Sequence, residues 1–134
     1  MFTNKDIEVF DNKLDDLEDS AEVLTDKVNE GLIKNQKAII SIIESYIKEH
    51  QLIVYGGNAQ NLAIKKIDPK GVFYDDKDVH DYDVYSFDPI NDAINLTKQI
   101  FKAGFKNILA IEAIHVETYS IKYYGTPLCD FSYM

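Results

Sequence analysis

Residues 52–67 read LIVYGGNAQNLAIKKI, an apolar run followed by two glycines and a helix-like segment. The run at 52–55 is short and rich in β-branched and aromatic residues, which is typical of a buried strand. Gly56 and Gly57 end that strand, and the pattern after them predicts a helix over 58–67. This strand, turn and helix form the unit from which the fold prediction is built.

The segments that follow also alternate between strand and helix. DYDVYS at 81–86 alternates and is β-rich, whereas 89–103 starts with proline, precedes Gly104 and predicts a helix. Three further strands are expected at about 107–112, 115–123 and 127–133. The expected buried face of the helix at 89–103 consists of Ile90, Ala93, Ile94, Thr97 and Ile100.

The first fifty residues predict helices. Apolar side chains recur there at alternating spacings of three and four, namely Ile7, Phe10, Leu14, Leu17, Ala21, Leu24 and Val28. Such a stripe fits either a coiled-coil or partner-docking helix, or an amphipathic helix that covers its own domain. We favour the covering helix, because three heptads are marginal for a coiled coil. Gly31 is expected to end or bend this helix before a second one at about 34–49. The predicted fold class is α/β, with an N-terminal helical segment at 1–50 and a mixed sheet at 51–134.

The composition limits the classes of function. Apolar residues make up 46% of the 134 positions and the formal net charge is −9, with lysine as the only cation besides histidine. A chain this acidic is not a simple electrostatic sleeve for nucleic acid, and without arginine it offers no arginine finger. One cysteine excludes an internal disulfide. No apolar run approaches the ~20 residues of a membrane span, so no membrane partner is expected.

The paired carboxylates of Asp81 and Asp83 are the first candidate site residues. Residues i and i+2 of a strand point to the same face, so both carboxylates project together. Such a pair repels itself unless a cation lies between the charges, and Mg²⁺ or Mn²⁺ prefers oxygen ligands. An isolated Asp-x-Asp in an acidic loop is more often part of a solvated surface, so this motif alone does not establish a metal site.

Asp130 strengthens the interpretation. It lies within the apolar run LCDFSYM at 128–134, where an aspartate is costly unless it is paired or bound to metal. If this strand lies beside the strand at 81–86, three carboxylates converge. That arrangement is typical of two-metal phosphoryl transfer.

The two glycines supply an anion site for the same hypothesis. Without Cβ atoms at Gly56 and Gly57, backbone N–H groups can approach a phosphate closely, and the helix dipole favours an anion. The pair lacks the Lys-Ser/Thr of a Walker A loop and the spacing of a dinucleotide fingerprint. A plain strand-to-helix turn remains the alternative.

The order of these motifs resembles the nucleotidyltransferase superfamily with a DNA polymerase β-like palm. More narrowly, IVYGGNAQN, DYDVYSFDP, GFKNILAIEAIHVETYSIKYYG and LCDFSYM resemble the poly(A) polymerase catalytic subunits of poxviruses and mimivirus-like large cytoplasmic DNA viruses. The resemblance covers about residues 50–134. It implies that 51–134 is a nucleotidyltransferase palm and part of a larger polymerase chain.

The resemblance also implies a reaction and site residues. The expected activity is template-independent addition of AMP from ATP to the 3′ end of RNA, that is, mRNA polyadenylation. Gly56 and Gly57 would hold the triphosphate, and Asp81 and Asp83 would bind two Mg²⁺ or Mn²⁺ ions. Asp130 would complete the second metal site and help to deprotonate the RNA 3′-hydroxyl. Ser86, at the end of the same strand, would hydrogen-bond a phosphate or cap the following segment.

Two alternatives stay open. The first is a truncated palm that acts as an inactive binding or regulatory module. The second is a nucleotidyltransferase with another acceptor. Beyond ATP and RNA, the resemblance implies a second copy or a processivity subunit as partner. It also implies a cytoplasmic location, in the viral factory or virion of an infected cell.

Overall fold

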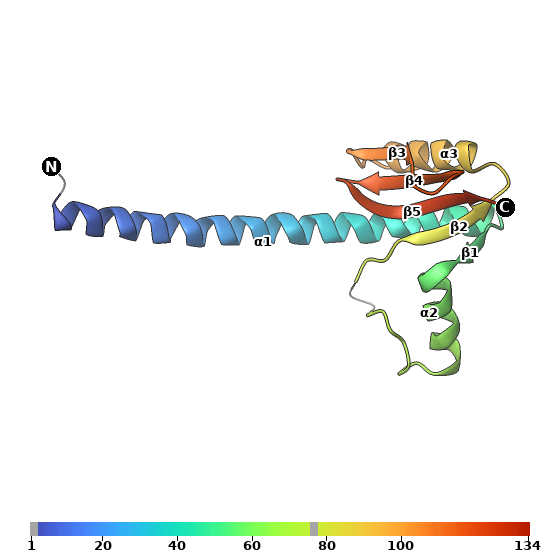
Figure 1. Ribbon diagram of the computed structural model, residues 1–134, viewed down its shortest axis with the longest axis horizontal. Helices are drawn as coiled ribbons and strands as arrows, with labels where there is room; N and C mark the ends of the chain where they lie inside the picture. Colours follow the sequence, from blue (N-terminus) through green and yellow to red (C-terminus); the bar gives the residue numbers. More distant parts are fainter. Residues whose placement is uncertain (1–2, 76–77) are drawn as a thin grey trace. The chain divides into compact units, whose positions relative to one another are not determined.

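The computed structural model of the protein describes residues 3–75 and 78–134 (Figure 1). Its helices and strands follow the order expected from the sequence after residue 51. They are α1 (Asn4–Glu49), β1 (Ile53–Tyr55), α2 (Gly56–Ile67), β2 (Tyr82–Ser86), α3 (Pro89–Lys102), β3 (Ile108–Glu112), β4 (Thr118–Tyr123) and β5 (Thr126–Tyr133).

The N-terminal region forms one helix where two were predicted. α1 continues through Gly31 to Glu49, so the predicted boundary at Gly31 is wrong. A single glycine inside a helix costs only about 1 kcal/mol relative to alanine, and the flanking residues Glu30 and Leu32 are good helix formers.

The chain divides into two compact units, Met1–Lys34 and Asn35–Met134. In the first unit the apolar stripe is solvent-exposed: Phe10, Leu17 and Leu24 are 63%, 66% and 67% exposed. The predicted division after residue 50 stays a prediction, and the second unit already includes the last four turns of α1.

The second unit is built on a five-stranded sheet in the order β1-β2-β5-β4-β3. β2 and β5 pair in parallel, and the other neighbours pair antiparallel, so the sheet is mixed. The predicted neighbourhood of the strand at 81–86 and the strand at 127–133 is confirmed. This central parallel pair carries most of the candidate site.

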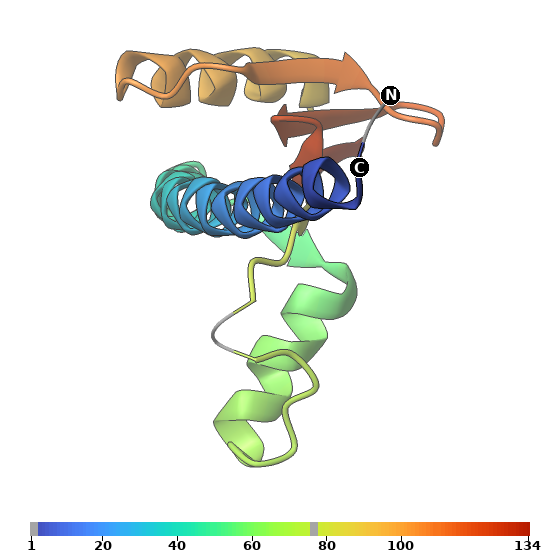
Figure 2. The same cartoon turned by 90° about the vertical axis from the view of Figure 1, so that its left-hand side faces the viewer.

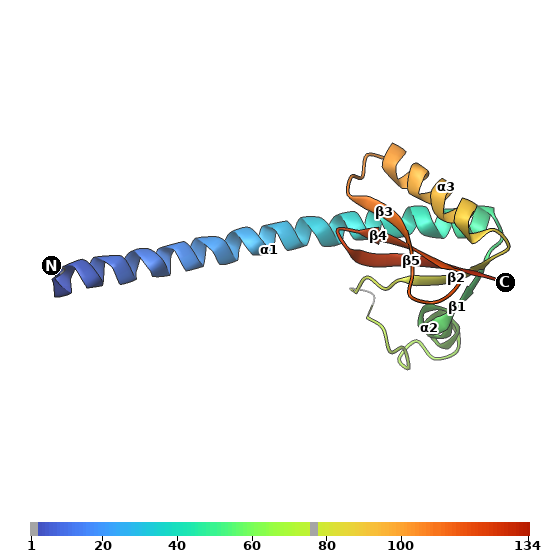
Figure 3. The same ribbon diagram turned by 45° about the horizontal axis from the view of Figure 1, so that its top comes forward.

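Helices cover one face of the sheet. Tyr46 of α1 contacts Phe131 of β5 edge-on, and its hydroxyl donates to Asp92 of α3 at 2.6 Å. Figure 3 shows α3 and the end of α1 on this side, and Figure 2 shows α2 at the other end of the sheet, beside β1. The core between them is fully buried and includes Ile39, Ile43, Val84, Leu96, Ile100, Ile121 and Phe131.

The face of α3 that meets the core differs from the prediction by one position. Ala93, Leu96 and Ile100 are buried, whereas Ile90 and Ile94 are 48% and 40% exposed. Asp88 caps the helix by accepting from the Asn91 amide, which fixes where the helix starts. Because each residue adds about 100° around the helix, Leu96 belongs to the stripe of Ala93 and Ile100, and Ile94 does not. The α/β class with an N-terminal helix and a mixed sheet is confirmed.

Candidate active site

The parallel pairing of β2 with β5 places Asp83 directly opposite Asp130. Neighbouring strands lie about 4.8 Å apart, so the two side chains leave the same face of the sheet side by side. Asp81 is exposed and immediately precedes β2, two positions before Asp83. The structure therefore places Asp83 and Asp130 side by side, and the charge of Asp81 is near enough to raise the pKa of Asp83.

The two faces of β2 have opposite character because side chains alternate along a strand. Tyr82, Val84 and Ser86 are buried beneath the helices, whereas Asp83 and Tyr85 are only partly buried on the other face. The carboxylates thus lie on the face that α1 and α3 leave open. A substrate can approach Asp83 there without displacing the core.

Gly56 begins α2 directly beside this acidic face. Its φ is +72°, a left-handed conformation that favours glycine. A methyl group at this position would also overlap the Asp83 carboxylate. The close approach of the turn to Asp83 therefore requires glycine for two independent reasons.

The N-terminus of α2 has no side-chain cap. Tyr55 occupies the N-cap position without a capping hydrogen bond, and the first turn contains no acidic residue. The first amides of a helix need partners from outside it, and the helix dipole makes this end attractive to anions. The turn at Gly56 and Gly57 can thus receive a phosphate next to Asp83.

The electrostatics of the acidic face favour a cation. The pKa of Asp83 is raised, first by burial and then by the charges of Asp81 and Asp130. One carboxylate oxygen of Asp130, Oδ1, is buried and has no hydrogen-bond partner within the described part of the chain. A bound cation would reduce the repulsion between the carboxylates and give the buried oxygen of Asp130 a partner.

The donor set fits a hard divalent cation, since ionised carboxylates supply only oxygen acceptors. Among the residues described, 3–75 and 78–134, no three His, Cys, Asp or Glu side chains lie together closely enough to hold a metal ion. Without a bound cation, the negative charges of the three carboxylates repel one another and keep the side chains apart. Asp81, which is exposed, is the side chain with most freedom to close that shell.

Hydroxyl groups surround the acidic face, and sequence reasoning missed them as a group. Tyr55 and Ser132 share a hydrogen bond of 2.8 Å, and Ser132 shares another of 3.0 Å with Thr118. The rings of Tyr55 and Tyr85 stack with centroids 4.0 Å apart. The alternation of side chains along a strand could have indicated Ser132, because it lies two positions after Asp130 and points to the same face. Thr118 reaches Ser132 through the antiparallel pairing of β4 with β5, which fits a hairpin turn at 124–127.

Ser86 lies away from this cluster. It is 1% exposed and on the helix-covered face, where its hydroxyl donates to Asp92 and accepts from the Asp88 amide at 2.9 Å. These contacts tie β2 to the start of α3. The predicted capping of the following segment agrees with this geometry, and a nucleotide contact stays a prediction.

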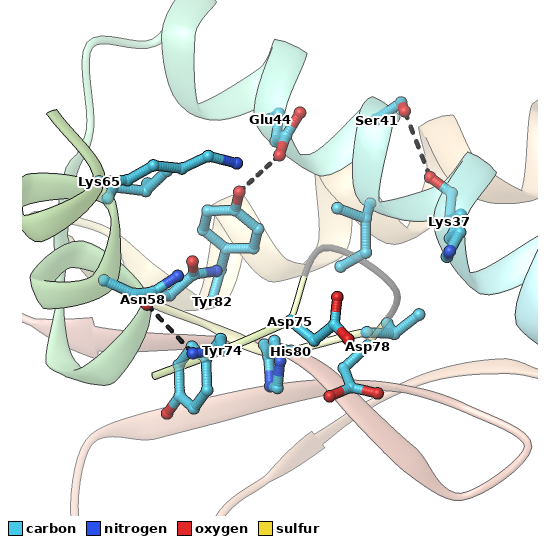
Figure 4. A pocket seen from close by; sticks show the side chains of 14 residues that line it. Lys37, Ser41, Glu44, Asn58, Lys65, Tyr74, Asp75, Asp78, His80 and Tyr82 are labelled. Atoms are coloured by element: carbon cyan, nitrogen blue, oxygen red, sulfur yellow. Dashed lines mark hydrogen bonds between the residues drawn. The ribbon is translucent and has the colours of Figure 1, made fainter. Parts of the chain in front are cut away.

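A polar pocket of about 330 Å³ opens between α1, α2 and the segment that precedes β2 (Figure 4). Tyr82 forms part of its wall and donates a hydrogen bond to Glu44 of α1. Lys37, Lys65 and His80 also line it. Since Tyr82 and Asp83 point to opposite faces of β2, this pocket is distinct from the acidic face.

Comparison with known proteins agrees with the geometry. A family model described as "Poly(A) polymerase catalytic subunit" matches residues 41–134, which contain every strand and all three aspartates.

The chain belongs to this family.

Viral proteins are among its relatives. A protein of Acanthamoeba polyphaga mimivirus described as a poly(A) polymerase catalytic subunit is 34% identical over 132 residues. That match covers 98% of this chain and 23% of the relative. Proteins of the same description from African swine fever virus are 30% identical over 99 residues, covering 73% of this chain and 20% of each relative. The chain thus spans about a quarter of the length of the family members it matches.

A solved structure shows the same fold. The crystal structure of Megavirus polyadenylate synthase superposes with a TM-score of 0.76 and 30% identity. The match covers 100% of this chain and 27% of that one. Among the described helices, none is both long and apolar enough to cross a membrane.

Proposed function

We propose that the chain is the palm of a polynucleotide adenylyltransferase that transfers AMP from ATP to the 3′ end of RNA. One observation carries the proposal: the parallel pairing of β2 and β5 puts Asp83 beside Asp130, at the glycine turn that starts α2. Family membership supports the same reaction class.

Each group has a role in this reaction. The amides at Gly56 and Gly57 would bind the triphosphate of ATP at the start of α2. Asp81 and Asp83 would hold two Mg²⁺ or Mn²⁺ ions, and Asp130 would hold the one nearer the RNA. Bound divalent ions neutralise charge on the phosphates and lower the pKa of the attacking hydroxyl.

The bond changes follow from that arrangement. The RNA 3′-oxygen forms a bond to the α-phosphorus of ATP while the bond to the bridging oxygen breaks, and pyrophosphate leaves. Asp130, which has a carboxylate oxygen without a partner in the described structure, would accept the hydroxyl proton. Positioning and charge neutralisation supply most of the catalysis in such transfers.

An adenylyl-transfer assay tests the proposal. Purified protein is incubated with an oligo(A) RNA, α-labelled ATP and Mg²⁺ or Mn²⁺. We expect label to enter the RNA, and Asp83→Asn to reduce incorporation to background, because the neutral amide removes the negative charge and one of the two oxygen ligands. Asp15→Asn removes the same charge from an exposed position of α1 and serves as the matched control.

Two results would contradict the proposal. One is label transfer that persists in Asp83→Asn at the wild-type rate. The other is a wild-type protein that neither transfers AMP nor binds ATP in the presence of Mn²⁺. Binding of ATP without transfer would instead favour the alternative of a nucleotide-binding module.

The second copy or processivity subunit and the cytoplasmic location stay predictions.

A further inference from the structure

Phe73 and Tyr74 follow α2 in the chain and are anchored to that helix by one buried side-chain amide. Asn61 is 8% exposed, and its Oδ1 accepts hydrogen bonds from the backbone amides of Phe73 and Tyr74 at 3.0 and 3.2 Å. Two bonds to one acceptor fix the backbone of Tyr74 relative to α2.

The ring of Tyr74 is held as firmly as its backbone. It lies beside His80 (Figure 4) and stacks on it, with ring centroids 3.8 Å apart and planes at 17°. Phe73 contacts it edge-on, with centroids 4.6 Å apart. Because His80 immediately precedes Asp81, this stack links Tyr74 to the strand that carries the carboxylates.

The hydroxyl of Tyr74 lies where a side chain of Gly57 would be. A methyl group on Gly57 would overlap this oxygen and would come within 3.2 Å of the ring carbon that bears it. Gly57 is the second residue of α2, and the Cα–Cβ direction in a helix leans toward the N-terminus. The hydroxyl therefore lies beside the uncapped amides of α2.

This hydroxyl has no hydrogen-bond partner among the residues that the structure describes, although the backbone amide and the ring of Tyr74 are both held by contacts. A tyrosine hydroxyl is a donor as well as an acceptor, and hydrogen bonds to charged phosphate oxygens are the stronger kind. A phosphate at the start of α2 would supply such an acceptor.

We propose that Tyr74 is a further substrate-binding residue, whose hydroxyl donates a hydrogen bond to the triphosphate held at Gly56 and Gly57. Asn61 and His80 act as positioning residues that hold Tyr74 in place. The inference rests on the proposed function, because it names an additional contact to the same nucleotide. It also explains why the second position of α2 is glycine, since any side chain there would displace the hydroxyl.

The test is binding of MgATP and of inorganic tripolyphosphate to the purified chain, measured by titration calorimetry. Tyr74→Phe removes one oxygen and keeps the ring stack, so thermal unfolding should be unchanged. Loss of a hydrogen bond to a charged group is expected to weaken both ligands about ten- to hundredfold. Tyr124→Phe, which removes the same atom from an exposed turn, should leave both affinities unchanged.

A second readout separates ligand contact from packing. Mn²⁺ affinity without nucleotide should be the same in wild type and Tyr74→Phe, because the carboxylates are untouched. If Tyr74→Phe binds MgATP and tripolyphosphate as tightly as wild type, this inference is overturned while the proposed function stands. A lower unfolding temperature with a matching loss of Mn²⁺ affinity would also overturn it, since the hydroxyl would then be structural. Failure of the wild-type protein to bind either ligand would overturn the proposed function itself.

Discussion

The two faces of the β2–β5 pair differ in how completely their polar groups are satisfied. On the helix-covered face Val84 and Phe131 are fully buried, and Asp92 accepts from both Ser86 and Tyr46. On the other face the pKa of Asp83 is raised by burial and by neighbouring carboxylates, and an oxygen of Asp130 has no partner in the described structure.

This difference separates stability from function within one pair of strands. Buried polar groups in folded proteins are normally paired, and exceptions tend to lie at functional sites. On the helix-covered face, Ser86 and Asp92 follow the rule and tie β2 to α3. On the acidic face, Asp130 departs from it, which is consistent with the proposed binding of a cation there.

The largest expected effect is on the helix-covered face. Phe131→Ala leaves a cavity against Tyr46 and should lower the free energy of unfolding by about 3–5 kcal/mol. Urea denaturation followed by circular dichroism measures this. Phe101→Ala, at a 62% exposed position of α3, is the matched control and should cost much less. Equal costs for both variants would mean that this face is not the core.

A smaller loss is expected from Ser86→Ala. The substitution leaves the Asp92 carboxylate and the Asp88 amide each without one partner, which costs about 1–3 kcal/mol for a buried group. Ser45→Ala, which removes an exposed hydroxyl from α1, should have little effect in the same denaturation experiment.

The same variant tests the predicted nucleotide contact of Ser86. Because the hydroxyl lies on the face opposite Asp83, MgATP affinity should be unchanged in Ser86→Ala under conditions where the variant is folded. A selective loss of MgATP affinity would instead support a direct contact and would contradict the assignment of this hydroxyl to the fold.

The smallest effect should have the opposite sign. Asp83→Asn removes a charge that burial, Asp81 and Asp130 disfavour, so it should raise the unfolding temperature by a few degrees at pH 7 without metal. The pKa of Asp83 is higher in the folded protein than its ordinary value of 3.8. The protonated carboxyl therefore contributes stability below about pH 3.8, and this contribution is lost as pH rises through the folded-state pKa. The advantage of the variant should therefore shrink as pH falls toward 3.8, which scanning calorimetry across pH can measure. A variant that is less stable than wild type at pH 7 would contradict the account.

Much of this arrangement could be predicted from the sequence, because strand alternation and glycine punctuation are local signals. The convergence of Asp83 and Asp130 needed one further assumption, that their strands are neighbours, and the pairing confirms it. The register of α3 was missed because Ile90, Ile94 and Leu96 are all apolar, and composition does not say which of them meets the sheet.

Contacts that depend on long-range folding were not visible in the pattern. Tyr74 lies in a loop whose path is set by Asn61, and nothing local indicates that its hydroxyl reaches Gly57. Likewise, the apolar period of residues 7–28 is equally regular whether the stripe is buried or exposed. Periodicity identifies a face of a helix, whereas tertiary contacts decide what covers it.

The central claim is that Asp81, Asp83 and Asp130 form a site for divalent cations on the open face of the sheet. Titration of the purified protein with Mn²⁺, followed by electron paramagnetic resonance, tests it most directly. We predict saturable binding in wild type and in Asp15→Asn, and a large loss of affinity in both Asp83→Asn and Asp130→Asn while these variants stay folded. Wild-type affinity in Asp83→Asn and Asp130→Asn, or no saturable binding in the wild-type protein, would contradict the claim.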